Sequence, residues 1–153
     1  MDCPTAGLGR RLAALLYDAF LIAAIWMLLG YVVQLFFGPD SVQVIEGQVV
    51  TDPVQDFLIF TLMIGSSFCF YAYFWMQTGQ TLGMIAWRIK VVSSTGQLIS
   101  LRQALARYAL AWPSFAALGL GYLWLYIEAN GDAFHDRYST TRVIVVPREH
   151  RPF

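Results

Sequence analysis

The residues of this 153-residue sequence that could do chemistry are charges placed inside long apolar runs. Asp18 interrupts the run that follows Arg10 and Arg11, and Arg107 lies near the start of a later run. A charge near the centre of a bilayer costs roughly 2.5–3.5 kcal/mol on insertion scales, so it needs an opposite charge, a proton or a water-lined cavity. Asp18 is therefore the first candidate for a group that exchanges a proton or a cation. The alternative is a structural ion pair that fixes the packing of the helices.

The spacing of the charges indicates which arginine pairs with Asp18. Arg11 lies seven residues before Asp18, on the same helix face but about 10 Å away along the axis. Arg11 is better placed at the level of the lipid headgroups, where a long side chain can extend toward water. Arg107 opens the third apolar run, at a similar depth if both helices start at the cytoplasmic side. We therefore expect Arg107 to be the partner of Asp18.

A third candidate is the triplet His135, Asp136 and Arg137. Histidine titrates near neutral pH, so beside a carboxylate and a guanidinium it could control proton access. The simpler interpretation is a turn in which Asp136 accepts backbone N–H bonds and Arg137 faces headgroup phosphates. Both interpretations stay open.

Composition places these residues in a membrane protein. The chain is 58% hydrophobic and only 13% charged, about half the charged share of a typical soluble domain. Three segments, at about 12–37, 54–76 and 104–127, approach or exceed the roughly 20 apolar residues that cross a bilayer. Proline or glycine, at Pro113 or in "LGLG" at 118–121, could break the third segment into a re-entrant hairpin or two short helices.

The connecting segments carry weaker patterns. In the acidic loop at 38–53, "SVQVIEGQVVT" alternates like a short hairpin, and Asp52 followed by Pro53 is typical of a helix start. In the connector at 77–103, "IAWRIKVV" alternates like a strand. "YSTTRVIVV" in the tail at 128–153 could pair with that strand. The expected fold is all-α and membrane-embedded, a single domain over 1–153, with a small two-stranded β element at the cytoplasmic face.

Charge placement predicts the orientation. The loop at 38–53 contains acids but no lysine or arginine, whereas arginines precede the first segment and follow the second. By the positive-inside rule the N-terminus is cytoplasmic. The C-terminal arginines argue for a cytoplasmic C-terminus, although three full crossings would place it outside. Together with Arg88 and Lys90 they form a basic face whose default partner is anionic lipid headgroups, so nucleic acid is not needed to explain it.

Three blocks in order resemble the RDD family of small membrane proteins, which are mostly bacterial. The family's arginine and first aspartate match Arg11 and Asp18 in "RRLAALLYD", and its later aspartate matches Asp136 in "FHDRYSTTRVIVV". Between them, "GQTLGMIAWRIKVVSSTGQLISLRQALAR" follows the family's glycine-rich connector and the arginine that opens the last apolar segment. Met84 stands where many members have lysine, which leaves Arg88 and Lys90 as the connector's cations.

The resemblance implies a multi-pass protein of the bacterial inner membrane. Transport of an undefined solute has been suggested for the family, and some members look linked to sodium/proton exchange. One hypothesis is therefore a small transporter in which Asp18 carries the exchangeable site, tuned by Arg11, Arg107 and Asp136; its few helices predict a homo-oligomer. The other is a non-catalytic membrane module that binds partners or assembles, with buried charges fixing helix register. Enzyme motifs and metal-ligand spacings are absent from the sequence, so we expect no cofactor.

Overall fold

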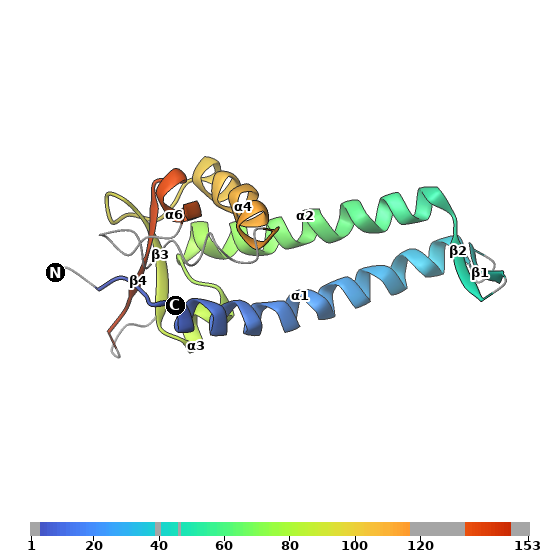
Figure 1. Ribbon diagram of the computed structural model, residues 1–153, viewed down its shortest axis with the longest axis horizontal. Coiled ribbons are helices and arrows are strands. Elements are labelled where there is room, and N and C mark those ends of the chain that lie inside the picture. The colour runs from blue at the N-terminus through green and yellow to red at the C-terminus, as the bar shows by residue number, and fades with distance from the viewer. Residues whose placement is uncertain (1–3, 39–40, 46, 117–133, 148–153) are drawn as a thin grey trace. The chain divides into compact units, whose positions relative to one another are not determined.

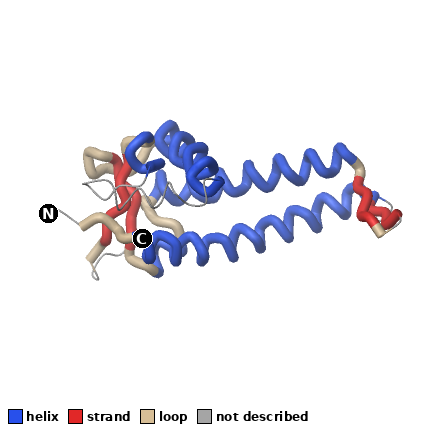
Figure 2. The backbone as a smooth tube through the Cα atoms, in the orientation of Figure 1, coloured by secondary structure: helices blue, strands red, loops and turns tan. Residues whose placement is uncertain are grey.

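The computed structural model describes residues 4–38, 41–45, 47–116 and 134–147. Two long helices, several shorter helices and two pairs of short strands make up the described chain (Figures 1 and 2). The elements are, in order, α1 (Leu8–Phe37), β1 (Val42–Ile45), β2 (Gln48–Thr51), α2 (Pro53–Gln77), α3 (Leu82–Ala86), β3 (Ile89–Ser93), α4 (Leu101–Ala116), α6 (Phe134–Tyr138) and β4 (Thr141–Val145).

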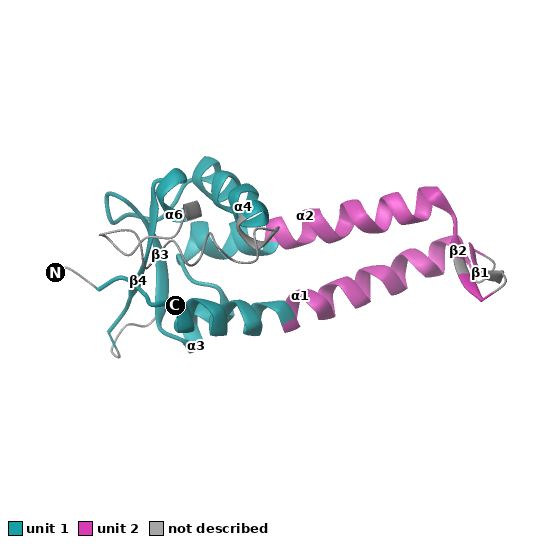
Figure 3. Cartoon of the chain, in the orientation of Figure 1, with its two compact units in different colours: residues 1–19, 70–153 teal, residues 20–69 magenta. Residues whose placement is uncertain are grey.

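The chain divides into two compact units (Figure 3). Unit 1 comprises residues 1–19 and 70–153, and unit 2 comprises residues 20–69. Each membrane-length helix contributes to both: α1 passes from unit 1 into unit 2, and α2 returns from unit 2 to unit 1. The candidate site residues all belong to unit 1.

Helices α1 and α2 are long and apolar enough to cross a membrane. Large side chains along both of them are exposed, including Phe20, Met27 and Phe36 on α1 and Phe57 and Phe60 on α2. Exposed apolar side chains of this number are unfavourable in water and are typical of helices that cross a bilayer. Two of the three predicted hydrophobic helices are thus confirmed as helices of spanning length and composition.

The third predicted hydrophobic segment, at 104–127, is not shown as a spanning helix. Within the described residues it is represented by α4, which has 16 residues and contains Pro113. Only α1 and α2 meet the length and composition of a membrane helix in that part of the chain. The "LGLG" break and the remainder of the segment fall in 117–133, outside the described residues.

Unit 2 contains the predicted hairpin and the predicted helix start. Strands β1 and β2 pair antiparallel, and Gly47 takes the positive φ of 79° that the turn requires. The Asp52 carboxylate accepts the N–H groups of Val54, at 2.7 Å, and Gln55, at 3.4 Å, so it caps α2. The hairpin therefore leads directly into the second membrane-length helix.

Hydrogen bonds also join α1 to α2 inside unit 2. The Trp26 indole donates to the Met63 carbonyl at 3.0 Å and to Ser67 Oγ at 3.1 Å. The Gln55 amide donates to Gln34 Oε1 at 2.8 Å. These hydrogen bonds give polar groups of two apolar helices partners within the protein, as a helix that crosses a membrane requires.

Unit 1 is built around the strand pair β3–β4. The two strands pair antiparallel from Ile89 opposite Val145 to Ser93 opposite Thr141, so the predicted pairing is confirmed. Ile89, Val91 and Val143 are almost completely buried and form its core. The strand pattern predicted from Ile85 was wrong in its first half, because Thr81 caps the short helix α3 there and β3 begins only at Ile89.

Candidate functional site

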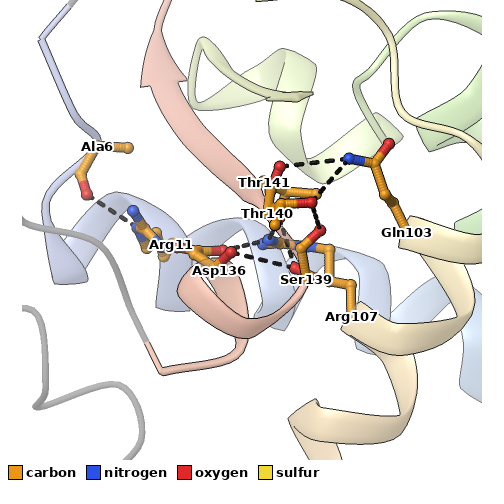
Figure 4. A network of polar contacts seen from close by, with 8 residues as sticks. All are labelled: Ala6, Arg11, Gln103, Arg107, Asp136, Ser139, Thr140 and Thr141. Carbon is orange, nitrogen blue, oxygen red and sulfur yellow. Dashed lines mark hydrogen bonds and ion pairs between the residues drawn. The ribbon is translucent and has the colours of Figure 1, made fainter. Parts of the chain in front are cut away.

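Asp136 lies at the centre of a buried ionic cluster that we call the RDR cluster, composed of Arg11, Asp136 and Arg107. The Arg11 guanidinium donates to one carboxylate oxygen of Asp136, and the Arg107 guanidinium donates to the other (Figure 4). Asp136 is completely buried, and the two arginines are 4% and 5% exposed. One carboxylate therefore joins the first turn of α1, the middle of α4 and the short helix α6.

The two guanidiniums of the cluster also contact neighbouring side chains and a backbone carbonyl. Arg107 Nη1 also donates to Thr141 Oγ1 at 2.9 Å, and the Arg107 guanidinium carbon lies 5.2 Å from the centre of the Trp75 ring. This cation–π contact adds a second attraction for the buried charge. Arg11 Nε donates to the Ala6 carbonyl at 2.9 Å, as Figure 4 shows. The cluster is thus tied to β4 and to the end of α2 as well.

Hydrogen bonds outside the cluster position the segments that carry Arg11 and Arg107. The Ala6 N–H donates to the Val143 carbonyl at 2.8 Å, and the Val145 N–H donates to the Pro4 carbonyl at 2.9 Å. The segment before α1 therefore lies against β4 and brings Arg11 to Asp136. On the other side, the Gln103 side-chain amide donates to Thr140 Oγ1 at 3.1 Å, which joins the start of α4 to the turn before β4.

Asp18 forms a separate site with the start of α3. Its Oδ2 accepts the Thr81 hydroxyl at 2.5 Å, and its Oδ1 accepts the Gly83 N–H at 2.9 Å. Thr81 Oγ1 in turn accepts the Met84 N–H at 3.2 Å and caps α3. Asp18 is completely buried, and its partners in the described residues are neutral donors.

The predicted pair of Asp18 with Arg107 is therefore wrong. Arg107 donates to Asp136, and the position expected for an arginine beside Asp18 is taken by a hydroxyl and a backbone N–H. The physical reason is geometric: the connector folds back so that the Thr81 hydroxyl and the Gly83 N–H at the start of α3 reach the carboxylate. Two neutral donors, the Thr81 hydroxyl and the Gly83 N–H, therefore stand where an arginine was expected.

Gly83 allows this close approach. A Cβ atom at position 83 would overlap the Ala14 carbonyl oxygen and would lie 2.9 Å from Asp18 Oδ1 and 3.0 Å from Tyr17 Cβ. Only glycine leaves room for α3 to contact the backbone of α1 here. Gly83 and Thr81 were not predicted as site residues, although Thr81 stands immediately before a helix start, where a capping hydroxyl is common.

The model of the RDD family matches residues 5–140, which is most of the chain. The chain belongs to the RDD family. No curated protein matches it, and no solved structure matches it.

In this RDD protein, the three residues that the resemblance identified form two sites. Arg11 and Asp136 meet in the RDR cluster, whereas Asp18 binds the start of α3. Arg107, the arginine that opens α4, completes the cluster. Thr141 and Trp75 contact Arg107 and were missed from the sequence, because neither belongs to a charge pattern.

The secondary candidates lie outside both sites or cannot be placed. Arg88 is exposed at the turn before β3, where its φ is 54°, and Arg137 is exposed on α6. His135 belongs to α6, but its side chain lies outside the described part of the structure. Asp136 does stand in a short helical turn, yet its carboxylate binds two guanidiniums, which the triplet alone did not predict. Within the described residues, no group of three or more His, Cys, Asp or Glu is placed to hold a metal ion.

Proposed function

We propose that this RDD protein is a non-catalytic membrane module that binds a partner or assembles with further copies of itself. The observation that carries the proposal is the double use of Asp136, whose two oxygens are bound by Arg11 and Arg107. The two guanidiniums and the one carboxylate sum to a charge of +1, and each charge is bonded to an opposite one. Buried charges paired in this way hold elements together and are poorly available to a passing ion. The cluster then fixes unit 1, and the exposed apolar faces of α1 and α2 contact lipid or another copy.

The proposal includes a location and an orientation. The protein is a multi-pass protein of the bacterial inner membrane, with its N- and C-termini in the cytoplasm. Its support is charge placement: the described charged residues of unit 2 are Asp52 and Asp56, whereas the exposed charges of unit 1 in the described residues are arginines. Such a distribution follows the positive-inside rule when unit 1 is cytoplasmic. Its partners are then the bilayer, anionic headgroups and a second copy of the chain.

A second candidate is cation/proton exchange at Asp18. One observation favours it: Asp18 is a completely buried carboxylate in a membrane-length helix, and no cation is bonded to it in the described residues. An uncompensated charge in such a place is costly, and binding a proton or a small cation would relieve that cost. In this version the RDR cluster stabilises the structure around the exchanging group.

Ion flux in proteoliposomes separates the two candidates. We would measure proton-coupled sodium, lithium and potassium flux for the native chain, Asp18→Asn and the control Asp56→Asn, an exposed acid of unit 2. The module proposal predicts flux no greater than that of empty vesicles for all three. Cross-linking would verify that each variant inserts and assembles as the native chain does.

Flux that depends on Asp18 would support the exchanger instead. Saturable flux in the native chain and in Asp56→Asn, with a loss of tenfold or more in Asp18→Asn, would overturn the module proposal. Asp18 would then be the exchanging group of a transporter.

A further inference from the structure

Helix α4 presents an apolar stripe on its outer side. Leu101 and Leu105 are each 54% exposed and Trp112 is 51% exposed, and their spacings of four and seven residues place them on one face. Ala104 and Arg107, on the opposite side of α4, are buried. We call Leu101, Leu105 and Trp112 the α4 stripe. Such a helix is amphipathic, with Arg107 directed into the protein and Leu101, Leu105 and Trp112 directed out of it.

Aromatic contacts connect the α4 stripe to the end of α2. The Trp112 ring lies 6.0 Å from the Tyr108 ring, and Tyr108 lies 6.3 Å from Tyr71. Tyr71 lies 5.1 Å from Trp75. Tryptophan and tyrosine are enriched where a membrane helix meets the headgroups. This series of rings therefore indicates that α4 lies at the level of the membrane–water interface.

The exposed charges described in unit 1, including Arg102 on α4, match an anionic surface. Exposed arginines occur throughout the described residues of unit 1, at positions 10, 88, 102, 137 and 142. The two acidic residues described in that unit, Asp18 and Asp136, are completely buried. The described surface charge of unit 1 is thus entirely positive. Juxtamembrane basic residues of this kind bind anionic lipid, each contributing a favourable interaction near the surface.

We infer that α4 lies in the membrane interface, with the α4 stripe against the acyl chains and the exposed Arg102 of the same helix against the phosphates of anionic lipids. Unit 1 contains residues 8–19 of α1 and 70–77 of α2, so one end of each membrane-length helix lies in the same unit as α4. Interfacial helices bury their apolar face about 5–10 Å into the headgroup region. The inference rests on the proposed membrane location and is independent of the choice between module and exchanger.

Depth measurements on labelled cysteines test the inference. In a background carrying Cys3→Ser and Cys69→Ser, single cysteines replace Leu101, Leu105 or Trp112 in the full chain and carry an environment-sensitive fluorophore. Thr95→Cys, in the exposed turn before α4, is the matched control. The proteins are studied in nanodiscs containing phosphatidylglycerol. Aqueous iodide and lipids with nitroxides at shallow and deep positions serve as quenchers.

The expected result is one common depth for the three stripe positions. All three labels should be quenched by the shallow nitroxide and be at least threefold less sensitive to iodide than the label at position 95. A helix that crossed the bilayer would instead separate positions 101 and 112 by about 16 Å in depth. Replacing phosphatidylglycerol with neutral lipid should increase the iodide sensitivity of the stripe at least twofold.

Several results would overturn the inference. Iodide quenching equal to that at position 95 would place the stripe in water, and unequal depths would show a crossing helix. Protection from both quenchers, with disulfide cross-linking between copies at position 105, would show that another copy covers the stripe. Equal iodide quenching of the stripe labels in anionic and neutral lipid would show that α4 does not bind anionic headgroups. Photolabelling of the unmodified chain with an apolar azide, followed by peptide mapping, checks that the cysteine variants report the native arrangement.

Discussion

Replacing Asp136 with asparagine is expected to cost about 3–5 kcal/mol of unfolding free energy. Asparagine keeps the size of the side chain but removes the negative charge, so two buried guanidiniums lose their shared counter-charge. A buried charge without a partner is far more costly than the loss of an ordinary hydrogen bond. The measurement is unfolding of the purified protein in detergent micelles, followed by circular dichroism as denaturant increases.

The control for this prediction is Arg10→Gln. Arg10 is next to Arg11 in sequence but is exposed, so removing its charge should change stability by less than about 0.5 kcal/mol. If Asp136→Asn proved as stable as Arg10→Gln, the cluster would not be a structural element. Arg10→Gln alone tests whether the loss of any positive charge near the start of α1 lowers stability.

Gly83→Ala is the second change with a large expected effect. The added methyl group would overlap the Ala14 carbonyl oxygen and crowd Asp18 Oδ1, so α3 would have to move away from α1. That movement would lengthen the hydrogen bonds that Asp18 accepts from Thr81 and Gly83. Overpacking of this kind typically costs 1–3 kcal/mol, and we expect about 3 kcal/mol because the obstructing atom belongs to the backbone.

Gly9→Ala is the matched control for Gly83→Ala. A Cβ atom at position 9 meets nothing within 4 Å, and alanine favours a helix over glycine. We therefore expect Gly9→Ala to be neutral or slightly stabilising in the same unfolding experiment. Equal stability of the two variants would contradict the close packing of α3 against α1.

Local sequence patterns predicted much of the fold because they depend on neighbouring residues. Apolar runs of sufficient length predicted α1 and α2. Asp52 followed by Pro53 predicted the start of α2, where the Asp52 carboxylate accepts the Val54 N–H at 2.7 Å. Each signal acts within a few residues, so no knowledge of the remaining chain was needed.

The partners of the buried charges were not predictable in the same way. Asp18 and Arg107 have opposite charges at similar expected depths, so the sequence favoured pairing them. The actual partners of Asp18 lie 63 and 65 residues away, in a connector whose glycines and hydroxyls carry no charge signal. Asp136 lies 125 residues from Arg11, and only the pairing of residues 4–6 with β4 brings them together. Such contacts depend on the tertiary path of the chain.

A double-mutant cycle between Arg107 and Asp136 tests most directly whether the RDR cluster is a structural lock. The stability of Asp136→Asn, Arg107→Gln and the double variant would be measured by unfolding under identical conditions. Because Asp136→Asn leaves Arg107 buried without its counter-charge, removing Arg107 as well should add little further cost. We predict a coupling free energy of about 1–3 kcal/mol, with the double variant at least as stable as Asp136→Asn alone. Strictly additive losses, with no coupling between the two positions, would contradict the account.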